Sequence, residues 1–304
     1  MADFLVGTGG WAYFKVPNKP SLKAYSEVFN FVEVNYTFYE YPSVQTVQRW
    51  RKTVPEDFVF SVRCHQDLTH RIGFVSTPRA YEVFYQMRSY CDILNSPYLV
   101  LETPAKYEIT QRNVKDVEDF FSSLHLEGVR LVWEYRAPIT QTVIDLMQYF
   151  GIIQCIDLSR QVPSFNLGVT YSRLFGKGQH TLYQFSDDEL AEIDQQARET
   201  NAKTVVLSYH GARMNSDAVR FIHYKTTGNF LPVTEYTGID SAKAVLAEDA
   251  TFPASKAQLK AEQGWKVIDL NSDKRVHLVE VLDKLPDKTY PSLDCVIDEL
   301  RVVL

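Results

Sequence analysis

Cysteine is scarce in this chain of 304 residues, and its four cysteines do not form a recognisable motif. Cys64, Cys91, Cys155 and Cys295 are scattered, with no CxxC pair and no regular spacing. A disulfide framework or a zinc ribbon needs cysteines at defined spacings, so the sequence indicates neither. We therefore expect reduced thiols, most of them buried.

Long hydrophobic segments are also missing. No segment approaches the roughly 18 apolar residues that a membrane-spanning helix needs. Residues 1–7 carry no cationic region of the kind that begins a secretion signal. We expect a soluble protein that is located in the cytoplasm and does not interact with membranes.

An excess of positive charge is absent as well. Lys and Arg number 32 against 38 Asp and Glu, which gives a net charge of -6. A general nucleic-acid coat relies on a basic face that neutralises phosphates, so this charge disfavours nucleic acid as a partner, although a local basic pocket stays open as an alternative. Hydrophobic residues make up 45% of the chain, enough for a sizeable buried core.

Eight short apolar runs rich in Val, Ile, Phe and Tyr predict β-strands. They lie near residues 3–7, 30–36, 57–64, 97–102, 129–135, 152–157, 169–175 and 203–209. Helix-like stretches separate most of them, at 20–28, 43–52, 78–93, 111–124, 140–150, 187–200 and 213–225. The connection 158–168 contains proline and glycine, which indicates an irregular loop.

Strict alternation of strands and helices implies parallel strands, and eight such units in about 225 residues fit a (β/α)8 barrel of the TIM type. A doubly wound open sheet is the alternative. It is disfavoured because the glycine-containing segment 7–11 lacks the GxGxxG spacing.

The alternation stops after residue 228. We expect a barrel domain over residues 1–228, then a linker and a small helical C-terminal domain over 229–304. Within this appendage the sequence predicts helices at 277–285 and 292–302, separated by a turn at Pro286.

The predicted strands end in polar residues. In the fifth strand Glu134 and Arg136 lie two residues apart and therefore share one face. The same alternation in the other strands selects Glu33, Asn35, Arg63, His65, Glu102, Asp157, Arg173 and His210. Active sites of such barrels lie at the carboxyl ends of the strands. Buried carboxylates and guanidiniums add no stability that apolar residues would not supply, so the whole set favours a functional site.

Two chemistries compete for these residues. The acidic residues, together with His65 and His210, are of the types that bind divalent metal ions. The three arginines would repel a cation in the same cavity, so we predict no metal and no cofactor. Arginine instead suits an anionic or polyhydroxylated small-molecule substrate, while Glu134 and a histidine exchange protons.

Two further groups of residues follow the predicted strands. Lys177, Gly178, Gly211 and Arg213 lie in the loops after strands seven and eight, where barrels frequently bind phosphate. A plain flexible turn is the alternative. Aromatic residues after strands one and two, including Trp11 and Tyr36, could stack on a sugar or a base. An aromatic lid on the barrel rim is the simpler explanation for these rings.

These motifs resemble the YecE-like family, domain of unknown function 72 (DUF72). The resemblance lies in residues 7–13 (GTGGWAY), 32–39 (VEVNYTFY), 49–63, 69–70, 133–136 (WEYR) and 171–176 (YSRLFG). It implies a TIM-type barrel over about residues 3–225, with no established activity and sometimes described as related to sugar isomerases. The site candidates that it implies are Glu33, Asn35, His70, Glu134, Arg136 and Arg173. The chain departs from the family pattern at Phe175, where histidine is common, and at 208–210.

The C-terminal segment resembles a second family, the small helical domain of unknown function 2795 (DUF2795). Residues 252–256 (FPASK) and 282–290 (LDKLPDKTY) carry this resemblance, which spans roughly 250–301. It implies no chemistry.

Together these observations predict an enzyme, an isomerase or a hydrolase, that acts on a small sugar-like or phosphorylated substrate. The predicted catalytic residues are Glu134, His70 and Glu33. The predicted substrate-binding residues are Trp11, Asn35, Tyr36, Arg63, His65, Arg136, Asp157, Arg173 and His210. A nucleic-acid-binding or scaffold protein is the alternative, and a metal-dependent hydrolase or nuclease is the third hypothesis.

Overall fold

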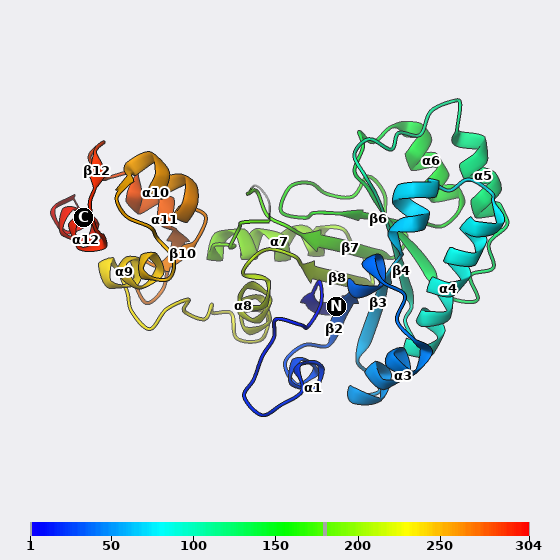
Figure 1. Ribbon diagram of the computed structural model, residues 1–304, viewed down its shortest axis with the longest axis horizontal. Helices are drawn as coiled ribbons and strands as arrows, with labels where there is room; N and C mark the ends of the chain where they lie inside the picture. Colours follow the sequence, from blue (N-terminus) through cyan, green and yellow to red (C-terminus); the bar gives the residue numbers. More distant parts are fainter. Residues whose placement is uncertain (1, 179–180, 304) are drawn as a thin grey trace. The chain divides into compact units, whose positions relative to one another are not determined.

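Eight parallel strands form a closed barrel in the computed structural model, which describes residues 2–178 and 181–303 (Figure 1). The strands follow one another around the barrel in chain order. They are β1 (Asp3–Thr8), β2 (Phe31–Val34), β3 (Val59–Arg63), β4 (Tyr98–Thr103), β5 (Arg130–Tyr135), β6 (Ile153–Ile156), β7 (Val169–Leu174) and β8 (Thr204–Tyr209). The predicted (β/α)8 barrel is confirmed.

Helices alternate with the strands along the chain. They are α1 (Ser21–Ser26), α2 (Tyr36–Tyr39), α3 (Val44–Thr53), α4 (Pro78–Leu94), α5 (Val114–Ser122), α6 (Gln141–Tyr149), α7 (Asp187–Glu199) and α8 (Met214–Thr227). Hydroxyl groups cap the starts of α3, α4, α6 and α7, because Ser43, Thr77, Thr140 and Ser186 each accept a hydrogen bond from the backbone N–H three residues later. As predicted, no helix forms in the connection between β6 and β7.

Two short helical segments between β2 and α4 were not predicted. One is α2, and the other is a π-helical turn, η1 (Asp67–Ile72). Neither segment is long enough to show a helical repeat of apolar residues in the sequence. Both follow directly on the carboxyl ends of strands, which is where they bear on the candidate site.

The barrel interior is apolar below its carboxyl end. Phe31, Val100, Val132, Tyr171 and Val206 belong to one buried cluster contributed by several strands. Close packing also explains the first glycine of the GTGGWAY motif, because a Cβ on Gly7 would lie 1.9 Å from the carbonyl oxygen of Phe31. Three of the four cysteines are buried free thiols, as predicted, and Cys295 is exposed.

Contacts divide the chain into two units. One unit consists of Met1–Leu174 with Gln196–Tyr209 and contains the whole barrel, and the other consists of Phe175–Gln195 with His210–Leu304. The domain boundary expected near residue 228 stays a prediction. A division by contacts groups the segments 175–195 and 210–228 with the C-terminal part, but it does not test which segment folds by itself.

The C-terminal part is helical, as predicted, but it also contains short strands. Its helices are α9 (Ile239–Ala247), α10 (Lys256–Gln263), α11 (Leu278–Leu282) and α12 (Leu293–Val303). β9 (Ala254–Ser255) pairs with β12 (Thr289–Tyr290), and β10 (Val267–Asp269) pairs with β11 (Arg275–His277), both antiparallel. The helix expected at 277–285 is shorter than predicted.

Helix α9 was missed because the sequence around it is polar. Its buried residues Ala242, Val245 and Leu246 are spaced as one helical face and join the core of this part of the chain. Leu259 of α10 and Ile297 of α12 belong to the same core.

A buried ionic network runs through the second unit. Arg220 of α8 donates to Asp187 at 2.6 Å, to Asp217 at 3.3 Å and to the carbonyl of Phe185 at 2.6 Å. Arg275 of β11 pairs with the same Asp187 at 3.5 Å and with Asp269 at 3.0 Å. The β7–α7 segment, α8 and the C-terminal part are therefore joined by charges that are shielded from water.

Glu189 provides a second connection within this unit. Its carboxylate accepts hydrogen bonds from the Tyr183 hydroxyl and the Ser186 backbone N–H, and its Oε2 lies 3.0 Å from Nε2 of His277. Burial opposes ionisation of Glu189, but the hydrogen bonds from His277, Tyr183 and Ser186 outweigh it and lower its pKa to about 2.

A Glu189→Gln variant should be less stable than the wild type by about 2 kcal/mol at pH 7, because a charged group loses its hydrogen bonds. A carboxyl group whose pKa is lowered on folding contributes stability above its ordinary pKa of 4.5 and loses it as the pH falls toward 2. The gap between variant and wild type should therefore shrink from pH 5 to pH 3, as measured by calorimetry. The exposed Glu280 offers a control, and Glu280→Gln should change little. A gap that is independent of pH would contradict this role of Glu189.

Candidate active site

Charged side chains occupy the carboxyl end of the barrel interior. Glu33 lies on β2, Arg63 on β3, Glu102 on β4, Glu134 on β5 and Arg173 on β7, each at or next to the last residue of its strand. Arg136 follows directly after β5. We call these six residues the charged cluster. Glu33, Arg63, Glu102 and Arg173 are buried, which is unusual for charges without partners.

The centre of the charged cluster is a pair of carboxylates on neighbouring strands. Glu102 and Glu134 are direct partners in the β4–β5 register, so their charges would repel each other if left alone. Two arginines bridge them. Arg136 donates from Nη1 to Glu102 at 2.8 Å and from Nε to Glu134 at 2.6 Å, and Arg173 Nη1 donates to both carboxylates.

Glu33 connects this pair to the deeper part of the barrel. Its Oε1 lies 3.1 Å from Nη2 of Arg173, and its Oε2 accepts a hydrogen bond from the Tyr171 hydroxyl at 3.0 Å. The Ser61 hydroxyl lies 2.7 Å from the same phenol oxygen. Since Tyr171 gives its proton to Glu33, Ser61 must donate to Tyr171. The sequence did not single out Ser61 or Tyr171, although both are inward-facing positions of predicted strands.

Arg63 connects the charged cluster to the loops after β1 and β2. It donates to Glu102 and, at 3.0 Å, to the side-chain oxygen of Asn35. Asn35 in turn donates to the carbonyl of Gly9 at 2.8 Å. The Arg63 guanidinium also lies 3.7 Å from the centre of the Phe38 ring, a cation–π contact.

The three carboxylates and three guanidiniums of the charged cluster balance to no net charge. Burial would raise the pKa of Glu134, but Arg173 and Arg136 outweigh it and hold that pKa below its ordinary value. Burial would likewise lower the pKa of Arg173, but Glu134, Glu33 and Glu102 raise it well above the ordinary value. Burial lowers the pKa of Arg63, with a further contribution from Arg173. Glu134 is therefore a carboxylate at neutral pH.

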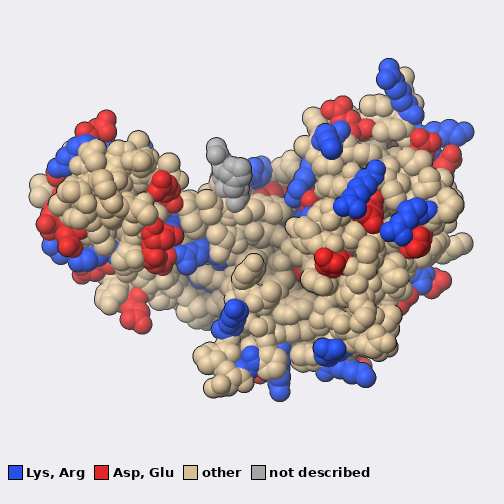
Figure 2. Space-filling view, in the orientation of Figure 1, with Lys and Arg blue, Asp and Glu red and all other residues tan. Residues whose placement is uncertain are grey.

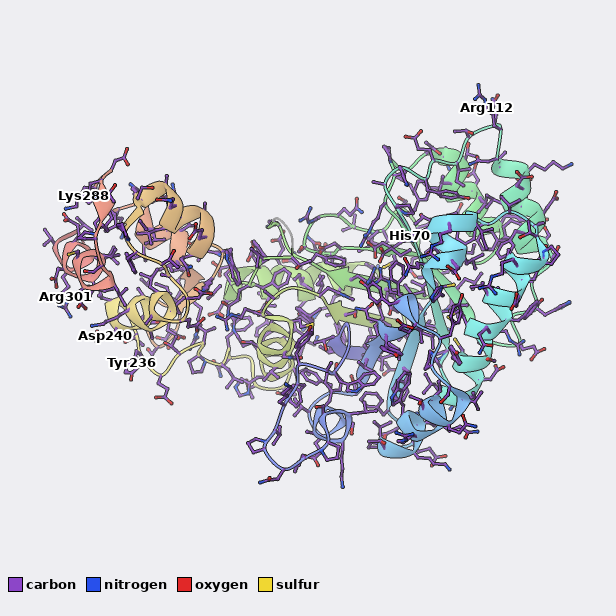
Figure 3. The ribbon with its side chains drawn as sticks, in the orientation of Figure 1. His70, Arg112, Tyr236, Asp240, Lys288 and Arg301 are labelled. Atoms are coloured by element: carbon purple, nitrogen blue, oxygen red, sulfur yellow. The ribbon has the colours of Figure 1, made fainter. Side chains whose placement is uncertain are left out.

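His70 belongs to η1 and lies beside Glu102 of the charged cluster. Figure 3 labels its position in the barrel unit. Its Nδ1 is 2.9 Å from the Thr69 hydroxyl, and its Nε2 is 3.9 Å from Oε1 of Glu102. Burial lowers the pKa of His70 and Glu102 opposes this, while the nearby guanidiniums of Arg63 and Arg136 lower it further. The imidazole is thus neutral at pH 7. π-helical turns occur often at functional sites.

The exposure of these side chains shows which of them a ligand can reach. The exposed fraction is 39% for the side chain of Arg136 and 26% for that of His70, but only 2% for those of Glu102 and Arg173. Arg136, His70 and the outer part of Glu134 therefore form the accessible side of the charged cluster. Glu33, Glu102 and Arg173 hold it from within.

His65 does not follow the strand alternation that placed it with Arg63. Strand β3 ends at Arg63, and the side chain of His65 stacks on the Tyr41 ring with centroids 3.9 Å apart. Its Nδ1 accepts a hydrogen bond from the backbone N–H of Asp67 at 3.1 Å. We find no contact of His65 with the charged cluster among the described residues, because the period-two rule ends with the strand.

Two other predicted site residues have partners of their own. Asp157 accepts hydrogen bonds from the backbone N–H and the hydroxyl of Ser159, at 2.9 and 2.6 Å, and so orders the loop after β6. His210, which belongs to the second unit, stacks on Phe175 with ring centroids 4.9 Å apart. The aromatic pair thus includes both places where the chain departs from the family pattern.

The predicted phosphate-binding residues also belong to the second unit. Lys177 lies 3.5 Å from Glu189, and Arg213 pairs with Glu248. A Cβ on Gly178 would lie 2.1 Å from the carbonyl oxygen of Leu182, and one on Gly211 would lie 2.9 Å from that of Tyr183, so close packing explains both glycines. Residues 179–180 of the same loop lie outside the described part of the chain. Phosphate binding here stays a prediction.

Trp11 and Tyr36 lie in the barrel unit and belong to one set of rings. Trp50 contacts both of them edge-on, with centroid distances of 5.3 Å to Trp11 and 6.1 Å to Tyr36. Tyr36 immediately follows Asn35 and begins α2. The prediction that aromatic residues gather after the first two strands therefore agrees with these contacts, while their role is untested.

The described residues form neither a metal-binding group nor a membrane-spanning helix. In residues 2–178 and 181–303 no group of three or more His, Cys, Asp and Glu side chains has the arrangement of a metal site. No described helix has the length and apolar character needed to cross a membrane. On the face in view in Figure 2, Lys and Arg are interspersed with Asp and Glu and form no continuous basic surface.

The closed barrel with alternating helices and polar strand ends makes this chain a TIM-barrel protein. The sequence comparison is more specific. The chain belongs to the DUF72 family, proteins of unknown function, whose family model matches residues 5–225. No curated protein matches the sequence.

A solved structure of another DUF72 protein resembles this fold. A DUF72 family protein from Enterococcus faecalis has a TM-score of 0.59 at 15% identity, covering 75% of this chain and 98% of its own. An AP endonuclease of family 2 from Brucella melitensis has a TM-score of 0.48 at 12% identity, covering 74% of this chain and 99% of its own. A D-tagatose 3-epimerase-like protein has a TM-score of 0.46 at 13% identity, covering 74% of this chain and 96% of its own. At these identities the likeness concerns the fold alone.

Proposed function

We propose that the barrel is an enzyme that performs acid/base chemistry on a small, polar, sugar-like substrate at the carboxyl end of its strands. The observation that carries this proposal is the charged cluster, in which Glu33, Glu102 and Glu134 are bridged by Arg173 and Arg136 inside the barrel. Such an arrangement costs desolvation energy that an apolar core would avoid. A function that needs fixed hydrogen-bonding groups explains it.

We assign the proton transfer to His70, which suits this role better than Glu134 does. A general base works best when its pKa lies near the working pH and its basic form is populated. The lowered pKa of His70 keeps it neutral and able to accept a proton. Its Nε2 lies 3.9 Å from Oε1 of Glu102, and 26% of its side chain is exposed. Glu134 and Arg136 then bind and orient hydroxyl groups, with Asn35 and Arg63 beside them.

The balance of charge favours a neutral substrate over a phosphorylated one. Every guanidinium of the charged cluster already pairs with a carboxylate. To bind an arginine of the cluster, a phosphate would have to displace the carboxylate that already pairs with it. The phosphate and the displaced carboxylate would then lie close together as like charges. Hydroxyl groups instead can both donate to the carboxylates and accept from the arginines.

Replacing His70 by Gln should lower turnover of a cognate sugar about a hundredfold or more, since a general acid or base contributes at least that much. Replacing Glu134 by Gln should weaken binding of the sugar, because the amide lacks the charge of the carboxylate. The substrate is found by a thermal-shift screen of free and phosphorylated sugars, in which a ligand of the folded state raises the melting temperature. Turnover is then followed by NMR of the sugar. Arg71→Met provides a control, because this exposed residue of η1 pairs with Asp67 and has no ion pair with another described residue.

Full activity in both variants would contradict the assigned roles. Unchanged sugar binding in Glu134→Gln would contradict the binding role of Glu134. A raised melting temperature with phosphorylated sugars, and not with free ones, would contradict the preference for a neutral substrate.

For the C-terminal part we propose membership of DUF2795 on the sequence motifs alone, and the YecE-like name for the barrel rests on the same kind of resemblance. The motif residues 252–256 and 282–290 include β9, the first residue of α10 and β12, around the core that α9, α10 and α12 share. Neither name adds a reaction to the proposal.

A further inference from the structure

An exposed group of aromatic side chains adjoins the charged cluster. It consists of Trp11, Tyr36, Tyr39 and Trp50, which we call the aromatic platform. The exposed fraction is 52% for Tyr36 and 60% for Tyr39. Neither phenol hydroxyl forms a hydrogen bond with another described residue, so both rings and both hydroxyls are available to a ligand.

Three rings of the aromatic platform are linked by contacts through Trp50, and the fourth, that of Tyr39, is held by Phe38. Trp50 contacts Trp11 and Tyr36 edge-on, at centroid distances of 5.3 and 6.1 Å. Tyr39 contacts the buried Phe38 edge-on at 4.9 Å. Edge-to-face contacts of this kind order the rings without covering their outer faces. The platform is thus an ordered surface and not a set of independent side chains.

Phe38 joins the aromatic platform to the charged cluster. One neighbour of its ring is Tyr39, and the others are the Arg63 guanidinium at 3.7 Å and the His70 ring at 5.0 Å. At the N-terminal end of α2, Tyr36 directly follows Asn35, whose side-chain oxygen accepts a hydrogen bond from Arg63. Tyr36 and Tyr39 therefore lie next to the polar groups of the proposed active site.

Leaving large aromatic rings in water has a cost that folding alone does not explain. Clustered exposed apolar surface marks a binding site more often than single exposed residues do. Tyrosine and tryptophan are well suited to sugars, because the ring face covers the C–H face of a pyranose and the hydroxyl can bind those of the sugar.

We propose that the aromatic platform is a second subsite, which takes a sugar ring that is linked to the one bound at the charged cluster. The substrate is then a glycoside or an oligosaccharide and not a single monosaccharide. This inference rests on the proposed function, since it extends the same site by one ring. The base of a nucleotide would stack as well, but the phosphates of that nucleotide would meet arginines that are already paired with carboxylates.

The test compares sugars of increasing length. Glucose, xylose and N-acetylglucosamine, each with its β-1,4-linked di-, tri- and tetrasaccharides, and maltose with its longer homologues, are titrated by calorimetry and by saturation-transfer NMR. In at least one series the affinity should rise about tenfold from the monosaccharide to the disaccharide. The Tyr36→Ala/Tyr39→Ala double variant should lose this increase.

Tyr149→Ala is the matched control, because this tyrosine of α6 is 83% exposed and lies outside the platform. It should bind all sugars as the wild type does. The inference is overturned if no sugar of the panel gains affinity with length, if the double variant keeps the gain, or if nucleosides bind the platform and sugars do not.

The same titrations separate this inference from the proposed function. If a monosaccharide is turned over and a second ring adds no affinity, the second subsite is wrong and the enzyme stands. If oligosaccharides bind through the platform but His70→Gln and Glu134→Gln change neither binding nor turnover, the platform stands and the proposed chemistry is wrong.

Discussion

An Arg173→Met variant should have a free energy of unfolding about 3–5 kcal/mol lower than the wild type, because removing one partner leaves buried charges uncompensated. Arg173 contacts Glu33, Glu102 and Glu134, and its own side chain is 98% shielded from solvent, with 2% exposed. Methionine fills much of the volume but offers no positive charge. Three carboxylates would then share a closed space with only Arg63 and Arg136.

The loss should depend on pH in a defined direction. Without Arg173, burial of Glu134 is opposed chiefly by Arg136, so the pKa of Glu134 rises in the folded variant. A carboxyl group whose pKa is raised on folding stabilises the protein at low pH and loses that contribution as the pH rises through the folded pKa. The variant should therefore be closest to the wild type at acid pH, where Glu134 is protonated, and the gap should widen as the pH rises through the folded pKa of Glu134 in the variant.

Urea denaturation followed by tryptophan fluorescence measures this effect, because Trp11, Trp50 and Trp133 all belong to the barrel unit. Arg71→Met is the control, since its exposed pair with Asp67 should contribute less than about 1 kcal/mol. A second variant, Arg173→Met with Glu33→Gln, should recover part of the loss. An Arg173→Met protein as stable as the wild type would show that the charged cluster is not held by Arg173.

Replacing Arg220 by Met should destabilise the second unit by a similar amount, about 3–5 kcal/mol. Arg220 is buried and pairs with Asp187 and Asp217. Burial raises the pKa of Asp217 to about 7, against the lowering effect of Arg220. Without Arg220 this pKa rises further, so the destabilisation should be larger at pH 8 than at pH 6, where Asp217 takes up a proton.

Hydrogen exchange of the backbone amides of α8 reports on this unit directly. In the Arg220→Met variant these amides should exchange faster than in the wild type, and more so at pH 8 after correction for the intrinsic rate. Arg301→Met is the control, because Arg301 of α12 pairs with Asp298 while more than half of its side chain is exposed. Unchanged exchange in α8 would contradict the role of Arg220.

The barrel could be predicted because its strands and helices differ clearly in sequence period. Each predicted strand overlaps an observed one, and the bounds differ by three residues at most. The prediction did less well in the C-terminal part. There α9 has only nine residues and lies between polar stretches, and the two-residue strands β9 and β12 are too short to show any period.

The members of the charged cluster could also be selected from the sequence, because strand alternation places Glu33, Glu102, Glu134 and Arg173 on inward positions. His65 lies apart from the charged cluster, since the chain leaves the strand after Arg63, and its role in substrate binding stays a prediction. Which arginine pairs with which carboxylate could not be predicted. These pairings depend on the register between strands, which a single sequence does not specify.

The arrangement around Arg173 restricts how this barrel can vary among relatives. One guanidinium satisfies carboxylates that come from β2, β4 and β5, so a change at any of these positions alters the charge balance at the other two. A neutral replacement of one acid leaves a surplus positive charge, and loss of the arginine leaves several negative ones. Sequence drift at these positions should therefore proceed through coordinated substitutions, and a relative that lacks one member of the set should lack its counterpart too.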